Sequence, residues 1–241
     1  MEAQNGVGRR GTWGILVVVL LVGVHLVRSG TAEWRTEHPP RPLAAAAPDH
    51  RTPATTAFGA VPGPLPASRP ARVRVPAVGI DAPVVGVGLD TDGGIGTPPA
   101  REGNLAGWFT GAVTPGEKGT AVVVGHVDTP AGRGVFFGLG ALGKGRRIEI
   151  ARQDGRTAVF SVYGVEVVPQ DGFPAERVYR AAAVPELRVL TCGGDFTEGR
   201  GYDGNLVVFA RLTEVRRAAD VPSGPRAAVR PSGRPTAPPP A

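Results

Sequence analysis

The sequence predicts an all-β fold for the middle of the chain. Short apolar runs, either alternating with polar residues or rich in β-branched residues, recur across residues 71–215, and glycine or proline interrupts them. Helical periodicity is weak over the same residues. The prolines are concentrated at the two ends, so the folded part is shorter than the 241-residue chain. Many short strands with few helices are typical of a β-barrel or a β-sandwich, and the pattern leaves both open.

Seven segments carry the strand pattern. The fourth and fifth of them flank Asp154-Gly155, a dipeptide typical of tight β-hairpin turns. Pro83 interrupts the second, which therefore predicts an edge strand or a bent one. Short helical turns are expected at 136–142 and 174–179. The expected strands are residues 72–75, 80–87, 120–125, 147–151, 157–168, 187–191 and 206–212.

The N-terminus predicts a membrane anchor. Residues 1–10 are polar and end in Arg9-Arg10, and no formal charge follows until Arg28. The uncharged run is at the short end of the roughly 17–25 residues that a spanning helix needs. We therefore expect a short cytoplasmic segment at 1–10 and a transmembrane helix at 11–28, with the rest of the chain outside the cell. A cleaved signal peptide is the alternative.

Two further segments lack any periodic pattern. Residues 29–70 are rich in proline, alanine and arginine, and residues 216–241 are similar, with three consecutive prolines near the end. Such segments cannot bury enough apolar surface to form a core. We therefore expect a disordered spacer and a disordered tail, with the folded domain at residues 71–215.

Composition narrows the possible functions. The formal net charge is +6, yet the arginines are scattered through the flanking segments, and no basic helix or basic aromatic face accompanies them. Nucleic-acid binding is therefore not expected. The chain contains one cysteine, which excludes an internal disulfide and a zinc site built from several cysteines. We expect neither a metal nor a cofactor. The single thiol is either buried core filler or a reactive group.

One histidine and one cysteine fall within the expected domain, and each follows an expected strand. His126 comes after residues 120–125, and Cys192 comes after residues 187–191 and before two glycines. Strand ends carry functional loops on a rigid scaffold, and glycines let a substrate backbone approach the thiol. The competing interpretations are a structural histidine and a small buried cysteine.

These residue types suit acyl transfer. A thiol becomes a strong nucleophile as the thiolate, and a neighbouring imidazole can take its proton and later give it to a leaving amine. Arg200 and Asp203 lie after Cys192 in the expected loop before the last strand. The Arg200 guanidinium could hold a developing negative charge, or it could be a solvated loop arginine.

Three motifs resemble those of the sortase family, most closely the actinobacterial class F group. They are Val-Val-Gly-His-Val-Asp at 123–128, Val-Leu-Thr-Cys-Gly-Gly at 189–194 and Gly-Tyr-Asp-Gly-Asn at 201–205. A Leu-Thr-Cys step at the end of a penultimate strand, with a strand-end histidine well upstream, is typical of sortases. The resemblance covers about residues 71–212, and the order of anchor, linker and β domain is also usual for the family.

The resemblance implies an eight-stranded β-barrel with short helices and a cysteine transpeptidase activity. Substrates would be secreted proteins with a C-terminal LPXTG-like sorting signal, cleaved after its threonine. Cys192 would form a thioacyl enzyme, and His126 would protonate the departing amine and then activate an incoming one. The acceptor would be a peptidoglycan precursor amine, or water in a side reaction. The alternative is a non-catalytic extracellular barrel that binds wall polymer or peptide.

The resemblance is incomplete at the third catalytic residue. Sortases generally place an arginine near the start of the last strand. Class F members often have Tyr-Arg-Asp-Asn where this chain has Tyr-Asp-Gly-Asn at 202–205. Arg200 is the nearest candidate for the missing cation. Arg211 is a poorer one, because it lies far along the final strand.

Three residues beside the catalytic pair are candidates for substrate binding. Thr191 and Gly193 flank the cysteine, and Asp128 follows the histidine by two positions, where it orients the imidazole or caps a turn. Trp108 and Phe109 precede the catalytic strand, and core packing is expected for both. No acidic cluster suggests the calcium site of some sortases.

Overall fold

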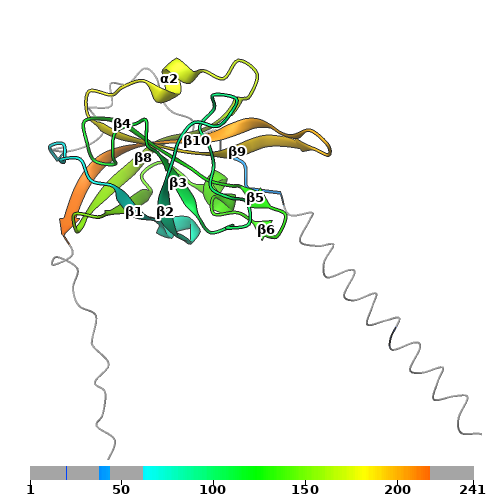
Figure 1. The fold of residues 1–241 in the computed structure, drawn as a ribbon, viewed down its shortest axis with the longest axis horizontal. Helices are drawn as coiled ribbons and strands as arrows, with labels where there is room; N and C mark the ends of the chain where they lie inside the picture. The colour runs from blue at the N-terminus through cyan, green and yellow to red at the C-terminus, as the bar shows by residue number, and fades with distance from the viewer. Residues whose placement is uncertain (1–19, 21–37, 44–61, 218–241) are drawn as a thin grey trace, which may run out of the picture.

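The structure is a computed structural model of the chain, and it describes residues 20, 38–43 and 62–217 (Figure 1). The expected anchor at 11–28 lies outside the described residues apart from Leu20. The expected segment 1–10 and most of the expected tail at 216–241 lie outside them as well. Within the described ranges, no helix has both the length and the apolar character needed to cross a membrane.

Eight strands close into a barrel, which confirms the predicted all-β fold and excludes the sandwich alternative. They are hydrogen-bonded in the order β1-β2-β3-β4-β9-β10-β8-β7, and β1 pairs with β7 to close the ring. Two of the neighbouring pairs, β2–β3 and β4–β9, are parallel. The barrel strands are β1 (Pro70–Val75), β2 (Ile80–Val87), β3 (Ala106–Phe109), β4 (Gly119–Val124), β7 (Arg147–Arg152), β8 (Arg156–Pro169), β9 (Pro185–Thr197) and β10 (Gly201–Arg217).

Short elements fill the connections between the barrel strands. A small ribbon of two strands follows β4, and the helical turns expected at 136–142 and 174–179 are present as a 3-10 helix and a short α-helix. The elements are η2 (Pro76–Val78), β5 (Asp128–Thr129), β6 (Gly132–Arg133), η3 (Phe137–Ala141) and α2 (Ala175–Tyr179).

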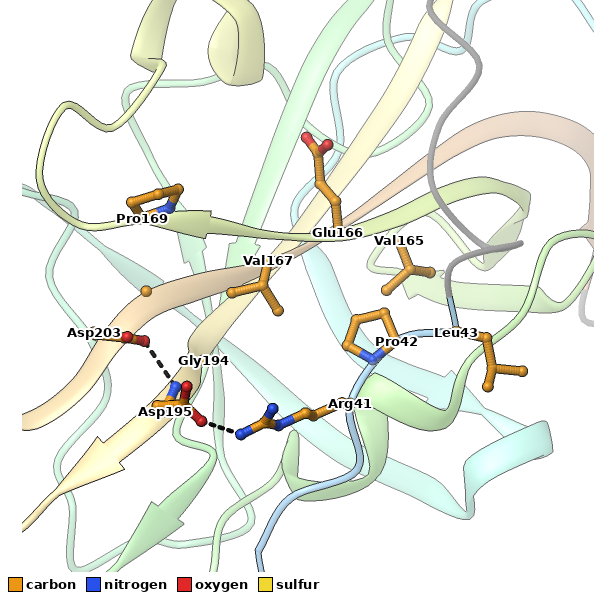
Figure 2. A pocket seen from close by; sticks show the side chains of 11 residues that line it. Arg41, Pro42, Leu43, Val165, Glu166, Val167, Pro169, Gly194, Asp195 and Asp203 are labelled. Carbon is orange, nitrogen blue, oxygen red and sulfur yellow. Dashed lines mark hydrogen bonds and ion pairs between the residues drawn. The ribbon is translucent and has the colours of Figure 1, made fainter.

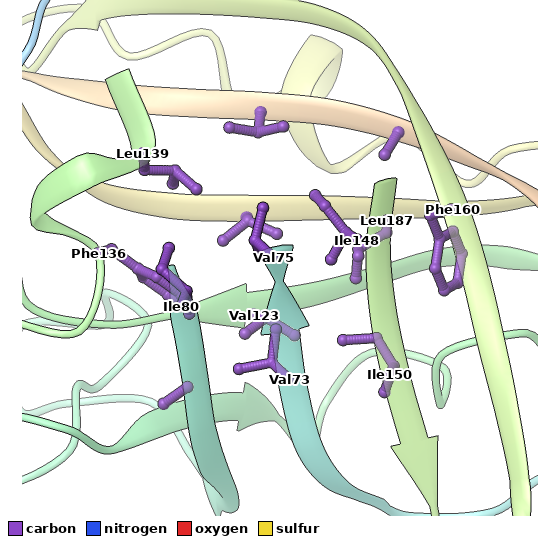
Figure 3. Packing of buried hydrophobic residues seen from close by; sticks show 14 of the residues in the cluster. Val73, Val75, Ile80, Val123, Phe136, Leu139, Ile148, Ile150, Phe160 and Leu187 are labelled. Carbon is purple, nitrogen blue, oxygen red and sulfur yellow. The ribbon is translucent and has the colours of Figure 1, made fainter. Parts of the chain in front are cut away.

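The main apolar core fills the barrel interior (Figure 3). In β1, Val73 and Val75 are fully buried, whereas Arg72 and Arg74 are on the other face and pair with Asp81 on β2. Side chains of a strand alternate between its two faces, so this alternation of apolar and charged residues is what fixes which face of β1 points inward.

Strand β4 is buried on both faces. Ala121 and Val123 belong to the main core, whereas Val122 and Val124 belong to a second apolar cluster that includes Val178 of α2. A strand covered on both faces has a continuous apolar sequence rather than an alternating one. The second cluster therefore explains the unbroken apolar run that precedes His126.

Two differences from the predicted strands bear on the site. The prediction missed β3, which has only four residues and includes a glycine, although Trp108 is buried in the core as expected. Strands β9 and β10 are longer than expected and continue past Cys192. The segment between Cys192 and the last strand was expected to be a loop. That expectation is wrong, because the two strands pair beyond the cysteine and form a β-hairpin.

The folded part also begins earlier than residue 71. The N–H of Leu65 donates to the carbonyl of Gly116 at 2.8 Å, and the Leu65 side chain packs against the core. The buried guanidinium of Arg152 donates to the carbonyls of Pro66 and Pro115. These contacts use main-chain groups of a segment without regular structure. Apart from the single side chain of Leu65 they leave no side-chain pattern, so the boundary could not be seen in the sequence.

Candidate functional site

The two candidate catalytic residues follow a pair of parallel strands. Val124 of β4 lies opposite Leu190 of β9, and the N–H of Gly125 donates to the carbonyl of Leu190 at 3.2 Å. His126 and Cys192 each stand two residues beyond that pair, at the end of the barrel where β4 stops. The two candidate residues therefore follow neighbouring parallel strands at the same end of the barrel.

Cys192 is an exposed free thiol on β9. Desolvation by the surrounding protein raises the pKa of this thiol, and the negative charge of Asp128 raises it further, although a backbone hydrogen bond acts in the opposite direction. Because the thiolate is the reactive form, the site at rest favours the unreactive thiol. A neighbouring base is therefore needed to take its proton.

The His126 imidazole is held by one hydrogen bond. Its Nε2 lies 2.7 Å from the carbonyl oxygen of Pro98, in the connection between β2 and β3. A carbonyl oxygen only accepts, so Nε2 carries the hydrogen and donates it. In the neutral ring, Nδ1 is then unprotonated and can accept the proton of the thiol.

Asp128 pairs with Tyr202 rather than with His126. The Tyr202 hydroxyl donates to Oδ2 of Asp128 at 2.6 Å. Burial raises the pKa of this hydroxyl, and the hydrogen bond to Asp128 and the charge of Asp128 raise it further, so the hydroxyl remains a donor. The bond ties β10 to the β5–β6 ribbon that follows His126. Asp128 therefore links the β9–β10 hairpin to the segment that follows His126. The sequence had suggested that Asp128 orients the imidazole or caps a turn, and this link is neither.

Thr191 and Gly193 flank the thiol and line the same cavity. Thr191 is buried, and its hydroxyl has no hydrogen-bond partner among the described residues. Leaving a buried hydroxyl unpaired is costly, but this oxygen is enclosed by protein and is not open to the cavity. Gly193 packs tightly on β10, because a Cβ at this position would lie 2.9 Å from the backbone nitrogen of Leu206.

A β-bulge follows the cysteine. Gly194 has a φ of +95°, and the pairing of β9 with β10 shifts between Tyr202 and Gly204. The N–H of Asp195 donates to the carboxylate of Asp203 at 2.7 Å. Asp203 stands at the position where class F sortases often carry arginine. Its carboxylate stabilises the bulge instead.

The structure does not bring Arg200 to the thiol. Arg200 is exposed at the tip of the β9–β10 hairpin, where its N–H donates to the carbonyl of Thr197 at 3.0 Å. Asn205 lies opposite Cys192, and the strand between Asn205 and Arg200 spans about 16 Å at 3.3 Å per residue. Figure 1 shows the hairpin projecting beyond the body of the barrel. We expected a loop that carries Arg200 back over the thiol. Residues 193–205 form a hairpin instead.

A buried ionic cluster lies at the opposite end of the same strands. Glu186 accepts hydrogen bonds from Tyr163 at 2.9 Å, from Arg188 at 2.7 Å and from Arg211 at 3.1 Å. Arg211 is thus directed away from Cys192, as expected. The cluster holds β8, β9 and β10 together and has no contact with the thiol site.

Residues 38–43 lie across the cavity at the thiol. Pro39, Pro40, Arg41 and Pro42 line this cavity together with Cys192. Figure 2 shows the Arg41 side chain directed at the Asp195 carboxylate, with which it forms an ion pair. Sequence reasoning missed this segment because residues 29–70 were treated as one uniform spacer. A proline-flanked arginine becomes informative only once the barrel surface is known.

The arrangement suits thiol-based acyl transfer. It offers an exposed thiol and, at the same end of the barrel, an imidazole whose Nε2 donates to a backbone carbonyl. Among the residues that the structure describes, no group of three or more His, Cys, Asp or Glu side chains could hold a metal ion.

Comparison with known families decides the assignment. A model described as the Sortase domain matches residues 73–213, which is more than half of the chain. The chain belongs to the sortase family. Sortases are cysteine transpeptidases, and the eight-stranded barrel is the fold of this family. No curated protein matches the chain.

Solved sortases of several classes are similar to this sortase at low sequence identity. Sortase E1 from Streptomyces coelicolor, with a tripeptide in the active site, has 16% identity and a TM-score of 0.48, covering 63% of this chain and 92% of that chain. Sortase SrtA from Actinomyces oris has 19% identity and a TM-score of 0.47, covering 68% and 91%. Streptococcus agalactiae sortase C1, in complex with MTSET, has 21% identity and a TM-score of 0.48, covering 62% and 72%.

Proposed function

We propose that this sortase is a class F-like cysteine transpeptidase with Cys192 as nucleophile and His126 as general acid and base. The observation that supports the proposal is the parallel pairing of β4 and β9, since His126 and Cys192 each follow this pair by two residues in a sortase domain. The class F assignment rests on the sequence motifs around His126, Cys192 and residues 201–205.

In the proposed reaction, the sulfur of Cys192 attacks the threonine carbonyl carbon of an LPXTG-like sorting signal. Nδ1 of His126 takes the thiol proton, the C–N bond after threonine breaks, and the imidazole returns the proton to the leaving amine. The acyl group is then held as a thioester. An amine of a peptidoglycan precursor, or water, gives a proton to His126, attacks the thioester and releases the thiol.

The oxygen that becomes negative during this attack needs a hydrogen-bond donor or a cation. The hydroxyl of Thr191 has no partner among the described residues, but it is enclosed by protein and acts here only if a local rearrangement exposes it. Arg200 is the proposed cation on grounds of sequence. It acts in this role only if substrate binding folds the hairpin back, since about 16 Å of strand separates its position from that of the thiol.

The proposed place of action is the outer face of the cell membrane. This part rests on the uncharged run at 11–28 and the spacer-like composition of 29–70. The proposed partners are secreted proteins with a C-terminal sorting signal and peptidoglycan precursor amines. Digestion of the catalytic domain by a protease added to intact cells would support this location, and complete protection would refute it.

The test of the reaction uses the full chain in detergent, a library of sorting-signal peptides and a set of amines. Mass spectrometry should detect peptides cleaved after threonine and joined to an amine. Cys192→Ala should abolish all such products while the barrel stays folded. Turnover that persists in Cys192→Ala, or peptide binding without any product, would favour the non-catalytic barrel instead.

A further inference from the structure

Asn205 lies directly opposite Cys192 in the barrel wall. Beyond the bulge the pairing of β10 with β9 is regular, and it sets Asn205 against Cys192. Residues directly opposite each other in an antiparallel pair point to the same face, with their Cβ atoms about 4.5–5.5 Å apart. Val207 and Leu190, the next pair on this face, belong to the second apolar cluster. The asparagine amide and the thiol therefore leave the sheet side by side, outside the barrel interior.

Asn205 has no evident task in the fold. Asparagine is depleted in strands and is used mainly in turns, where it tolerates a left-handed backbone or bonds to its own neighbours. Neither use applies here, because Asn205 pairs with strands on both sides and no non-glycine residue among those described has a positive φ. The side chain is half-buried, and within the described part of the chain its amide forms no hydrogen bond. Its N–H groups are therefore available to a molecule that binds over the thiol.

The other donors considered for the reacting oxygen do not stand beside the thiol. The Thr191 hydroxyl is enclosed by protein. Arg200 is at the tip of the hairpin, and Arg211 bonds to Glu186 at the opposite end of the strands. Acyl transfer needs a donor aimed at the oxygen on which negative charge develops. A side-chain amide on the neighbouring strand can meet that need without any change of the fold.

We propose that the side-chain amide of Asn205 is the oxyanion donor in both halves of the transpeptidation. The inference rests on the proposed function and adds a catalytic residue to it. When the sulfur of Cys192 bonds to the carbonyl carbon, an electron pair moves to the carbonyl oxygen, and Nδ2 of Asn205 donates a hydrogen bond to that oxygen. The electron pair returns as the C–N bond breaks. The same oxygen becomes negative again when the amine attacks the thioester, so one donor serves both steps.

The test compares Asn205→Leu with the parent, both as the full chain in detergent, on a sorting-signal peptide that the parent cleaves. Leucine is similar in size and lacks the N–H donors. Because the amide bonds to no protein group, the replacement leaves no partner unsatisfied, and the barrel should fold. Removing one oxyanion donor lowers kcat by about 10²–10³. The bond forms only in the transition state, so kcat/KM should fall equally and KM should stay the same. Intact-mass measurements should show slower formation and slower transfer of the thioacyl enzyme.

Labelling of Cys192 by methyl methanethiosulfonate separates an effect on the oxyanion from an effect on the thiol. The reagent forms a disulfide at the only cysteine of the chain, and this reaction creates no carbonyl oxyanion. Asn205→Leu should therefore be labelled at the rate of the parent. Thr213→Val is the matched control, because it also removes a side-chain donor from β10, one that bonds to the carbonyl of Val159 at 3.3 Å toward the far end of the strand. Its cleavage rate should equal that of the parent.

A lower kcat in Asn205→Leu, with the labelling rate unchanged, supports the role of the amide. An unchanged kcat overturns it, and so does a higher KM alone, because the amide would then bind the substrate without stabilising the transition state. Labelling that slows as much as cleavage also overturns it, because the amide would then act on the thiol. If Asn205→Leu does not fold, Asn205→Ala decides by the same criteria. A parent chain that cleaves no peptide would instead refute the proposed function, and this inference with it.

Discussion

Replacing Glu186 with glutamine removes the carboxylate that Arg188 and Arg211 share inside the barrel wall. Both guanidinium groups are nearly buried, with side-chain exposures of 5% and 7%. Removing one partner from a buried ion pair costs about 3–5 kcal/mol, because a charge remains without compensation. Arg188 keeps its bond to the carbonyl of Val178, so the lower figure applies. A loss of about 3 kcal/mol lowers the Tm by about 6–12 °C in a domain of this size.

The same replacement predicts a pH dependence. Burial raises the pKa of Glu186, but the charge of Arg188 and the hydrogen bonds from Arg188, Tyr163 and Arg211 outweigh it and leave the pKa below its ordinary value of 4.5. A carboxyl group with a lowered pKa in the folded state contributes stability above its unfolded pKa and loses it as pH falls through the folded value. The difference between the parent chain and Glu186→Gln should therefore be full at pH 7 and shrink below about pH 4.5.

Urea unfolding followed by tryptophan fluorescence, with thermal unfolding at several pH values, measures both effects. Glu214→Gln is the matched control, because Glu214 pairs with Arg216 where both side chains are partly exposed, at 42% and 30%. Such pairs contribute about 0–1 kcal/mol. Cys192 labelling below the Tm should not change, since the cluster lies at the other end of β9. A loss of stability in Glu186→Gln no larger than in Glu214→Gln would refute the reasoning.

Three further predictions concern the site. His126→Ala should lose nearly all turnover with an unchanged barrel by circular dichroism, because the leaving amine needs a proton. Asp128→Asn removes a charge that raises the pKa of the Cys192 thiol, so the labelling rate should rise at lower pH than in the parent chain; an unchanged pH profile would contradict this. Arg200→Ala should cost about 10²–10³ in rate if the hairpin folds back to stabilise the oxyanion, and a near-normal rate would exclude Arg200 from catalysis.

The strands of the barrel could be predicted where one face or both faces are buried. Alternation in β1 and the continuous apolar run of β4 both follow from which faces touch the core. The short strand β3 could not be predicted, because four residues with a glycine give too little periodicity. The contacts of Leu65 and Pro66 were also hidden, since they depend on backbone groups that meet partners far along the chain.

The two candidate catalytic residues could be predicted as residue types at strand ends, but the pairing of the strands that they follow could not. Nothing in the sequence states that β4 and β9, which are far apart in the chain, are parallel neighbours in register. The bond of Tyr202 to Asp128 depends on how far β10 continues past the cysteine. The position of Arg200 also depends on strand pairing that the sequence does not reveal. A spacing of a few residues places it near the thiol if the chain forms a compact loop, and far from it if the chain forms a hairpin.

The resting site has an electrostatic obstacle to reaction, which is the raised pKa of the Cys192 thiol. Desolvation is its largest cause, and the charge of Asp128 adds to it. A sorting signal that binds therefore meets a protonated thiol, which in the proposed reaction has to pass its proton to His126 before the sulfur attacks. Asp128→Asn lowers this obstacle without supplying a base, so cleavage by Asp128→Asn should still depend on His126.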